Sequence, residues 1–528
     1  MSQLTDRVDA VFAKWNKPDS PGCVLAVIKD GGFIYTRGYG MADLERGVPI
    51  TADSIFDIGS TGKQFTATVI AILANQGLLS IDDPIRKYLP EMPAYAEQIT
   101  IRQLLHHTSG LRDYLTLMEL RGMSMENIYA EDLLLDLITR QKGLNFKPGS
   151  EYLYSNSGYF LLGTIAQRVT RKHITELIRE HILHPLGMRQ TTFNKDYRPL
   201  VKMRAMSYDA GEKEGTFVNA LALSGGFGDG AVLTNVGDLL LWDRNFYDNK
   251  LNNAQPDLIE QLLQTGKLNN GKSIKYASGL VVDKYNGQII VKHGGGLAGY
   301  RTEMMRFPDH KFTIICIGNL GNLDPTMLCQ QAADIYLEDV FAPHKPKLKR
   351  ASNTSAAQVE TDEFTGIYQG RQSTVEISIK DNMAYLFNGV RDRPMRPLGK
   401  KKFQLEGHPI FLSFTGKQNE RLSIDEDGET VTKFKRVRNE RFIPSSLAIY
   451  AGKYFSSELD ICINLTVEDN TLQLIRTPFD DPKSLHPFTE DTFLYEAGEI
   501  RFHSKNGSPK GFILNAGRVT NIRFRKVS

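Results

Sequence analysis

Strand-like apolar runs lie at both ends of the first 340 or so residues of the chain. Residues 22–43 contain two such runs around Asp30-Gly31-Gly32, a combination that predicts a β-hairpin. Residues 289–320 return to short apolar runs, and the intervening segments carry apolar residues at helical spacing. Strands at both ends with helices between them predict an α+β domain whose ends meet in one antiparallel sheet.

One predicted helix begins close to Ser60-Thr61-Gly62-Lys63, because apolar residues follow at helical spacing at Phe65, Val69, Ile70, Ile72 and Leu73. Serine is a favoured N-cap, so the plain interpretation is that Ser60 caps this helix. The alternative is that Ser60 is a nucleophile and Lys63, on the same helix face, activates it. A helix start also offers free N–H groups to a developing oxyanion.

The last third of the chain has a different pattern and repeats. Residues 341–363 combine two prolines, a basic cluster and a small polar stretch, which is typical of a linker. Beyond it, residues 364–387 are echoed by residues 450–475, and alternating apolar positions within each copy indicate strands that are buried on one face. Two small antiparallel β-barrels are therefore expected. The expected divisions are a first domain at 1–343, a linker at 344–362, and barrels at 363–441 and 446–528.

Composition and charge exclude several classes of function. The 528 residues carry a formal net charge of +3, which argues against nucleic acid or an anionic membrane as a partner. The four cysteines are scattered and form no C-x-x-C pair, and no H-E-x-x-H occurs, so neither a disulfide framework nor a metal site is expected. Charged residues at Asp6, Arg7 and Asp9 interrupt any secretory signal, so a cytoplasmic location is expected.

Two further short motifs accompany Ser60 and Lys63. Tyr154-Ser155-Asn156 lies in an expected loop before an amphipathic helix, and His293-Gly294-Gly295 lies on or at the end of an expected strand. Each has a plain explanation by itself: Tyr154 and Asn156 are common in turns, and glycines after a strand histidine are typical of a bulge. The order of the three motifs along the chain favours a shared chemical role.

The ordered set resembles the serine penicillin-recognising enzymes, a family that includes class C β-lactamases, D,D-peptidases, esterases and D-aminopeptidases. In that family S-x-x-K opens a helix, Y-x-N lies on a loop, and K-T-G or H-x-G lies on a strand at the edge of the site. The first domain is similar to them elsewhere too, at LLHHTSGL, FKPGSEYLYSN and HPLGM. The segments STGKQFT and HGGGLAGY and the two following barrels are most similar to the D-aminopeptidases.

The resemblance implies a role for each motif residue. Ser60 is expected to attack, Lys63 to take its proton if the amine is neutral, and Tyr154 to pass the proton to the leaving group. Asn156 is expected to hold Lys63 and a substrate amide. By resemblance, the N–H groups of Ser60 and Gly296 form the oxyanion hole, and Gly295 and Gly296 let the strand approach the substrate. No cofactor or metal is expected.

The residue at position 293 bears on the substrate. The β-lactamases and carboxypeptidases of this group usually have a lysine there, a permanent cation suited to a substrate carboxylate. Histidine is mostly neutral near pH 7, so His293 favours amides, esters or amino-terminal residues over a free carboxylate. In the second barrel, residues 476–488 are expected to contribute to the substrate pocket, with Asp480 and Asp481 attracting a cationic amine.

These features predict a serine hydrolase that acts on small peptides, amides or esters through an acyl-enzyme, and the resemblance alone implies that it is a D-stereospecific aminopeptidase. An esterase or amidase on the same scaffold is the first alternative, and a β-lactamase or D,D-carboxypeptidase is the second. A degenerate, non-enzymatic sensor related to the penicillin-binding proteins stays open as a third. For assembly, a homodimer is one expectation.

Overall fold

The computed structural model divides into two compact units. The first contains Met1–Gly110, Ser124–Leu135 and Lys147–Leu348, and the second contains Leu111–Met123, Asp136–Phe146 and Lys349–Ser528. The residues described are 2–194, 198–222, 228–251, 257–341, 361–370, 373–380, 383–387, 392–399, 401–405, 410–425, 431–438, 444, 446–476, 481–495, 498–505 and 507–527.

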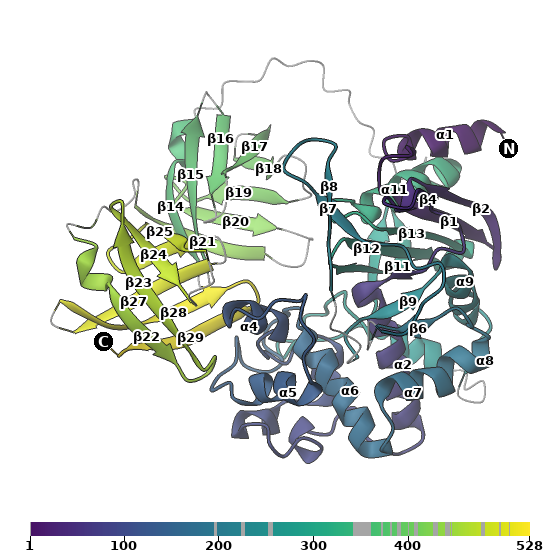
Figure 1. The fold of residues 1–528 in the computed structure, drawn as a ribbon, viewed down its shortest axis with the longest axis horizontal. Coiled ribbons are helices and arrows are strands. Elements are labelled where there is room, and N and C mark those ends of the chain that lie inside the picture. Colours follow the sequence, from purple (N-terminus) through teal and green to yellow (C-terminus); the bar gives the residue numbers. More distant parts are fainter. Residues whose placement is uncertain are drawn as a thin grey trace. The chain divides into compact units, whose positions relative to one another are not determined.

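A six-stranded antiparallel sheet forms the centre of the first unit (Figure 1). Its order is β10 (Val281–Tyr285), β11 (Gln288–Leu297), β12 (Tyr300–Phe307), β13 (Phe312–Gly318), β1 (Cys23–Lys29) and β2 (Gly32–Tyr39). Strand β1 pairs with β13 along its whole length, and β1 and β2 form the predicted hairpin. The α+β prediction, with both ends of the domain in one sheet, is therefore confirmed.

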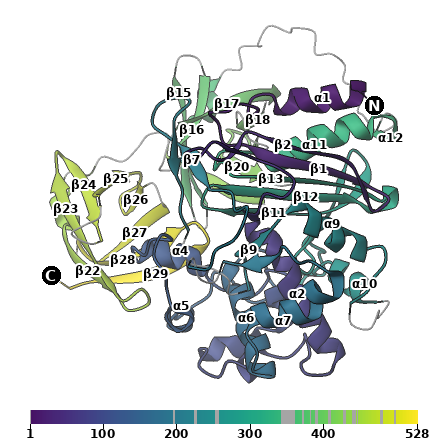
Figure 2. The ribbon, with the colours of Figure 1, turned by 45° about the vertical axis from the view of Figure 1, so that its right-hand side comes forward.

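Both faces of this sheet are covered by helices (Figure 2). On one face, α1 (Ser2–Phe12) and α11 (Pro325–Tyr336) pack on it through a core that includes Phe12, Leu25 and Phe307. On the other face, Asp243 of α9 (Val236–Asn245) accepts hydrogen bonds from Arg306 and Thr313 of the sheet, at 2.7 and 2.8 Å. The central strands β1 and β13 are therefore buried on both sides, whereas the edge strand β2 is partly exposed.

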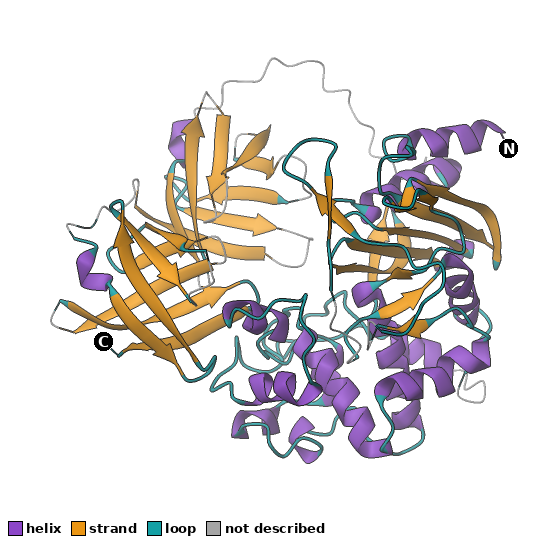
Figure 3. Ribbon diagram, in the orientation of Figure 1, coloured by secondary structure: helices purple, strands orange, loops and turns teal. Residues whose placement is uncertain are grey.

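The helical part of the first unit surrounds two longer helices, α2 (Lys63–Asn75) and α6 (Asn156–Thr170) (Figure 3). The other α-helices in the described part of the chain are α3 (Ile101–Leu105), α4 (Tyr114–Leu120), α5 (Glu131–Thr139), α7 (Ile174–Ile178), α8 (His184–Leu186), α10 (Leu258–Leu263) and α12 (Glu338–Phe341). The short strands are β3 (Met41–Asp43), β4 (Val48–Pro49), β5 (Phe56–Asp57), β6 (Thr192–Phe193), β7 (Tyr208–Ala210), β8 (Phe217–Asn219) and β9 (Val232–Thr234).

The prediction that Ser60 caps a helix is wrong. Ser60 is the second residue of a short 3-10 helix, η1 (Gly59–Gly62), and this turn leads directly into α2. Ile58 is the N-cap of η1 and Gly62 that of α2, and neither cap uses a side-chain hydrogen bond. Because the extra turn displaces the start of α2 by three residues, the Ser60 hydroxyl is available for another role.

Two closed antiparallel barrels of eight strands follow the first unit along the chain, as predicted. The first contains β14 (Gly366–Gly370), β15 (Thr374–Lys380), β16 (Met383–Phe387), β17 (Asp392–Gly399), β18 (Lys402–Leu405), β19 (Phe411–Thr415), β20 (Arg421–Asp425) and β21 (Val431–Arg438). The second contains β22 (Gly452–Ser456), β23 (Ile461–Glu468), β24 (Thr471–Ile475), β25 (Lys483–Pro487), β26 (Thr492–Tyr495), β27 (Gly498–Lys505), β28 (Ser508–Ala516) and β29 (Val519–Lys526).

The two barrels share a structural detail that confirms the sequence repeat. Tyr368 in β14 is buried and donates its hydroxyl to the carbonyl of Phe364, four residues earlier, at 2.9 Å. Tyr454 in β22 is also buried and donates to the carbonyl of Tyr450, again four residues earlier, at 2.8 Å. Equivalent buried tyrosines on equivalent strands indicate two copies of one fold.

The second unit also includes two segments that the sequence boundaries assign to the first domain, Leu111–Met123 and Asp136–Phe146. Arg112 joins them to the second barrel, because its guanidinium donates to Glu458 at 2.5 Å, to Gln141 at 2.9 Å and to the carbonyl of Thr520 at 2.9 Å. Side chains at both ends of the Arg112–Glu458 ion pair are almost fully buried. Most of the predicted linker, 344–360, lies outside the described residues.

Candidate active site

Lys63 lies at the first position of α2 and is fully buried. Its Nζ atom is 3.1 Å from Ser60 Oγ, 2.8 Å from Asn156 Oδ1 and 2.5 Å from the backbone oxygen of Asp229. Asn156 is the first residue of α6, directly after the N-cap Ser155. Two of the three predicted motifs, S-x-x-K and Y-x-N, therefore meet at one amine.

Tyr154 lies beside the same amine. Lys63 Nζ is 5.1 Å from the centre of the Tyr154 ring and 5.5 Å from that of Tyr159. The ring of Tyr154 is also 4.1 Å from the ring of His107 and 6.3 Å from that of His293, measured between centroids. The structure thus brings together Tyr154, Lys63 and His293, as the sequence predicts.

His293 in β11 is engaged at both ring nitrogens. Its Nε2 atom is 2.9 Å from the Tyr276 hydroxyl, and its Nδ1 atom is 2.6 Å from the backbone oxygen of Gly294. A neutral ring with its proton on Nδ1 satisfies both contacts, because Nδ1 then donates to the carbonyl and Nε2 accepts from the hydroxyl. Burial, and after it the positive charge of Lys63, lowers the pKa of His293 to about 3. The ring is therefore uncharged near neutral pH.

Strand β11 lies against the η1 turn at a distance that only glycine allows. A Cβ atom on Gly295 would lie 1.9 Å from the backbone oxygen of Ile58. Gly59 has a φ of +50°, and a Cβ atom there would lie 2.8 Å from the backbone nitrogen of Gly296. The contact brings the backbone of Gly296 next to the turn that carries Ser60.

Asp57 stabilises the η1 turn through a hydrogen bond to its backbone. Its carboxylate accepts the Gly59 N–H at 2.8 Å, and the side chain is fully buried. Burial raises the pKa of Asp57 to about 6, although the Gly59 N–H and the positive charge of Arg204 oppose this shift. The residue is thus a titratable group one hydrogen bond away from the segment that holds Ser60.

His107 and Tyr276 are the main site residues that sequence reasoning missed. His107 has a left-handed backbone (φ +55°), its Nδ1 accepts the N–H of Ser155, and its carbonyl accepts the N–H of Leu153, so it holds the loop that carries Tyr154. Its ring also contacts that of Tyr276, at 4.4 Å between centroids. The motif LLHHTSGL was a signal for His107, whereas no sequence motif marks Tyr276.

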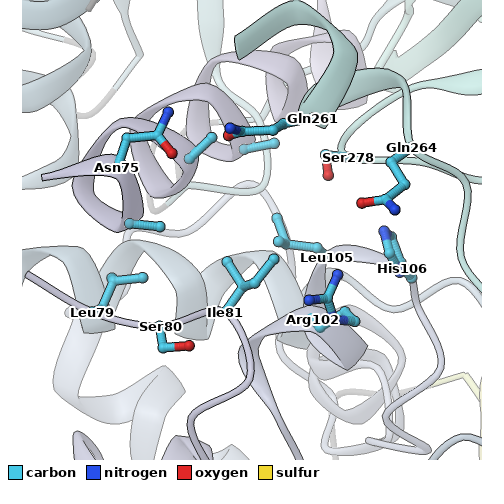
Figure 4. A pocket seen from close by; sticks show the side chains of 13 residues that line it. Asn75, Leu79, Ser80, Ile81, Arg102, Leu105, His106, Gln261, Gln264 and Ser278 are labelled. Carbon is cyan, nitrogen blue, oxygen red and sulfur yellow. The ribbon is translucent and has the colours of Figure 1, made fainter. Parts of the chain in front are cut away.

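A separate cavity of about 360 Å³ runs along α2 (Figure 4). Ala67, Ala71 and Ala74 leave room on the helix, and Figure 4 shows His106, Gln264 and Ser278 near one end of the cavity. None of the predicted site residues is among the described residues that line it. The two consecutive histidines therefore lie in different environments: His106 lines this cavity, and the ring of His107 lies beside that of Tyr154.

Two predicted substrate contacts belong to the second barrel. Asp480 lies outside the described residues, and Asp481 is exposed in the segment before β25. Their part in substrate binding stays a prediction. Across the described ranges, no three His, Cys, Asp or Glu side chains are grouped so as to hold a metal ion. No helix in those ranges has the length and apolar character needed to cross a membrane.

Comparison with known proteins assigns the fold and the family. The family model described as beta-lactamase matches residues 8–328, more than half of the chain. The chain belongs to the beta-lactamase family. Penicillin-binding protein 4* of Bacillus subtilis (strain 168) is 31% identical to it over 415 residues, which cover 75% of this chain and 90% of that protein. A D-aminopeptidase of Brucella anthropi is 27% identical over 461 residues, which cover 86% of this chain and 82% of that protein.

Solved structures agree with this fold. The octameric penicillin-binding protein homologue from Pyrococcus abyssi matches with a TM-score of 0.58 and 24% identity, over 82% of this chain and 99% of that one. The resemblance to the serine penicillin-recognising enzymes is therefore confirmed, and this beta-lactamase-family chain is an enzyme of the serine hydrolase type.

The geometry of this beta-lactamase-family site suits acyl transfer. A buried amine contacts a hydroxyl that stands on a tight turn, backbone N–H groups of that turn lie beside a glycine strand, and aromatic rings surround the amine. Such an arrangement combines a nucleophile, a base and backbone donors within one site.

Proposed function

We propose that the chain is an aminopeptidase that releases amino-terminal D-residues from peptides, amides or esters through an acyl-enzyme at Ser60. The observation that carries the proposal is the 3.1 Å contact between the buried Lys63 Nζ and Ser60 Oγ. A serine hydroxyl is a weak nucleophile until a base takes its proton, and Lys63 is the basic group in contact with this one.

Lys63 acts as the base in its neutral form. The carbonyl of Asp229 and the amide oxygen of Asn156 can only accept hydrogen bonds, so a neutral amine donates one N–H to each. Its lone pair then faces the Ser60 hydroxyl, the one of these three neighbours that can donate. Burial favours this form, because an ammonium ion without solvent costs much more free energy than a neutral amine.

The reaction proceeds in two steps. Ser60 Oγ attacks the substrate carbonyl while its proton moves to Lys63, and the oxyanion is held by the N–H groups of Ser60 and Gly296. The close approach of β11 to the η1 turn supports this pairing of donors. Tyr154 relays this proton from Lys63 to the leaving amine or alcohol, so the carbonyl–leaving-group bond breaks and Lys63 is neutral again. Water then attacks the acyl-enzyme and gives its proton to Lys63, which returns it to Ser60 Oγ as the bond between Ser60 and the acid breaks.

His293 acts as a positioning residue, since its ring nitrogens are engaged by Tyr276 and Gly294. It supplies no fixed positive charge at neutral pH, because its burial holds its pKa well below the usual range. A substrate anchored by a free carboxylate would meet no cation at this position. An amino-terminal residue, amide or ester fits better.

The preference for D-residues rests on likeness to relatives. The Brucella anthropi protein, which matches 86% of this chain, is named a D-aminopeptidase. The Bacillus subtilis relative is named a penicillin-binding protein, which keeps acylation by penicillin as a second candidate activity. The uncharged His293 argues against that candidate, because β-lactam substrates carry a carboxylate. An esterase or amidase with the same mechanism is the other alternative.

Two paired comparisons test the proposal: hydrolysis of D- against L-alanine p-nitroanilide, and of free against N-acetylated D-alanine p-nitroanilide. The D-anilide with a free amine is expected to react faster in both pairs, because an aminopeptidase site leaves buried acceptors unsatisfied when the amine is blocked. Faster cleavage of the L-anilide, or equal cleavage of the acetylated one, would instead favour the esterase. Acylation by benzylpenicillin with no anilide turnover would favour the penicillin-binding activity.

A further inference from the structure

A hollow of about 1010 Å³ lies on the first unit, and none of the residues assigned to catalysis is among its described lining residues. Thr192 of β6 and Leu233 of β9, which are paired in the small sheet with the order β5-β9-β6, both line it. Part of its wall is therefore formed by the β6–β9 pair.

Cationic side chains dominate the lining of this hollow. Arg179, Arg189, Arg198, Lys202 and Arg204 all border it, and Glu176 is the acidic side chain among its described lining residues. The whole chain has a formal net charge of only +3, so this concentration is local. Four of the five cations are arginines, whose planar guanidinium groups bind phosphate or carboxylate oxygens in pairs.

Arg179, Arg189 and Lys202 form no ion pair with an acidic side chain of the described residues. Arg179 instead lies 5.6 Å from the centre of the Phe193 ring. Cations just outside the hollow do have partners. Lys172 pairs with Glu180 at 2.5 Å, and Arg168 pairs with Glu91 at 2.5 Å.

We propose that this hollow binds an oligoanion, a ligand with several phosphate or carboxylate groups close together. Arg179, Arg189 and Lys202 carry like charges around one hollow, and such charges repel each other and raise the local concentration of anions. The volume matches a large small-molecule site, because ligand pockets usually measure about 300–1,000 Å³. A single anion would engage one or two of the cations, whereas an oligoanion engages cations from several walls at once.

The proposed anion binding can be tested separately from the chemistry proposed at Ser60. Arg204 is the one cation of the hollow that also faces the catalytic segment, because its charge acts on Asp57. A test should therefore leave Arg204 unchanged. Arg189 and Lys202 are exposed and lie outside helices and strands, so reversing their charge removes the proposed contacts and leaves the core intact.

Isothermal titration calorimetry with tripolyphosphate and, separately, with citrate at low ionic strength tests the site. The natural protein is expected to bind at least one of the two probes with one-to-one stoichiometry, and added salt should weaken the binding. The two probes distinguish phosphate from carboxylate recognition. The double variant Arg189→Glu/Lys202→Glu is expected to bind at least about tenfold more weakly, since two charge-assisted contacts become repulsive.

Lys14→Glu/Lys17→Glu is the matched control, because it changes the net charge equally at exposed lysines of another surface. It should bind as the natural protein does. Three results would overturn the proposal: no binding of either probe, full binding by the Arg189/Lys202 variant, or an equal loss in the control. The last result would mean that net charge alone attracts the probes.

Discussion

At the residue scale, the site depends on a lysine that is buried among oxygen atoms. Lys63 contacts a hydroxyl, an amide oxygen and a backbone oxygen, all within 3.1 Å. His293 is equally constrained, with Tyr276 at one ring nitrogen and the Gly294 carbonyl near the other. Because both side chains are buried, their hydrogen bonds hold each of them in one position.

Tyr276→Phe tests the positioning role of His293. The change removes the hydroxyl that lies 2.9 Å from Nε2 and leaves a buried acceptor unsatisfied, at a cost of about 1–3 kcal/mol. We expect kcat on the best substrate to fall about tenfold or more, with little change in KM. Tyr285→Phe is the control, because it removes a half-buried hydroxyl that contacts Asp334 outside the site. Full kcat in Tyr276→Phe would show that the His293 orientation does not matter for turnover.

The sequence pointed to the residues within the motifs, but not to the residues that position those side chains in the fold. Ser60, Lys63, Tyr154, Asn156 and His293 lie close together, as the family resemblance of their motifs implies. Tyr276 lies in a segment without a recognisable motif. It contacts His293 only because the fold brings its hydroxyl to within 2.9 Å of His293 Nε2. Contacts between segments that are distant in the sequence produce no local sequence pattern, so local patterns cannot predict them.

At the element scale, the site is built where the η1 turn meets strand β11. The approach is so close that the Gly295 position has no room for a Cβ atom, which would lie 1.9 Å from the Ile58 oxygen. On the other side of the turn, Asp57 accepts the Gly59 N–H at 2.8 Å. Both contacts are made by Ile58 and Gly59, the two residues directly before Ser60, so they hold the turn that carries it.

Gly295→Ala should separate β11 from the turn. The added methyl group cannot be accommodated without a backbone shift, since the nearest atom belongs to the main chain. We expect kcat/KM to fall at least about a hundredfold, because a shift of about 1 Å at a catalytic site has effects of that size. Gly32→Ala on β2 of the same sheet is the control, since its Cβ atom would have only Lys29 O within 4 Å, at 3.9 Å. Near-normal activity in Gly295→Ala would contradict the proposed geometry.

The elements themselves were largely predictable, whereas their exact starts were not. The hairpin at Asp30-Gly31-Gly32 and the repeated barrels follow from turn residues and alternation. The N-cap assignment of Ser60 failed because a 3-10 turn precedes α2. Such a turn is stabilised here by contacts with Asp57 and β11, and apolar periodicity carries no information about those contacts.

At the scale of the whole molecule, the chain of the first domain twice contributes segments to the second unit. Arg112 and Glu458 form a buried ion pair at 2.5 Å in this unit, and Asn145 adds hydrogen bonds to the backbone of Arg518 and Thr520. The sequence showed the barrel repeat but not these contacts, because Arg112 and Glu458 are 346 positions apart.

Arg112→Met should destabilise the second unit strongly. Removing one partner of a buried ion pair leaves an uncompensated charge at Glu458, which typically costs about 3–5 kcal/mol. Hydrogen–deuterium exchange of the β29 amides should therefore accelerate markedly. Arg140→Met is the control, since Arg140 pairs with partly exposed Asp136 and Asp460, and such pairs contribute about 1 kcal/mol or less. Equal exchange rates in the two variants would contradict a central role for Arg112.

The most direct test of the central claim, that Ser60 is a nucleophile activated by Lys63, is labelling with a fluorophosphonate followed by peptide mass spectrometry. The account predicts one adduct, on Ser60, that is absent from Ser60→Ala and forms at least about a hundredfold more slowly in Lys63→Ala. An adduct on another residue, or labelling of Ser60 at an unchanged rate without Lys63, would contradict it.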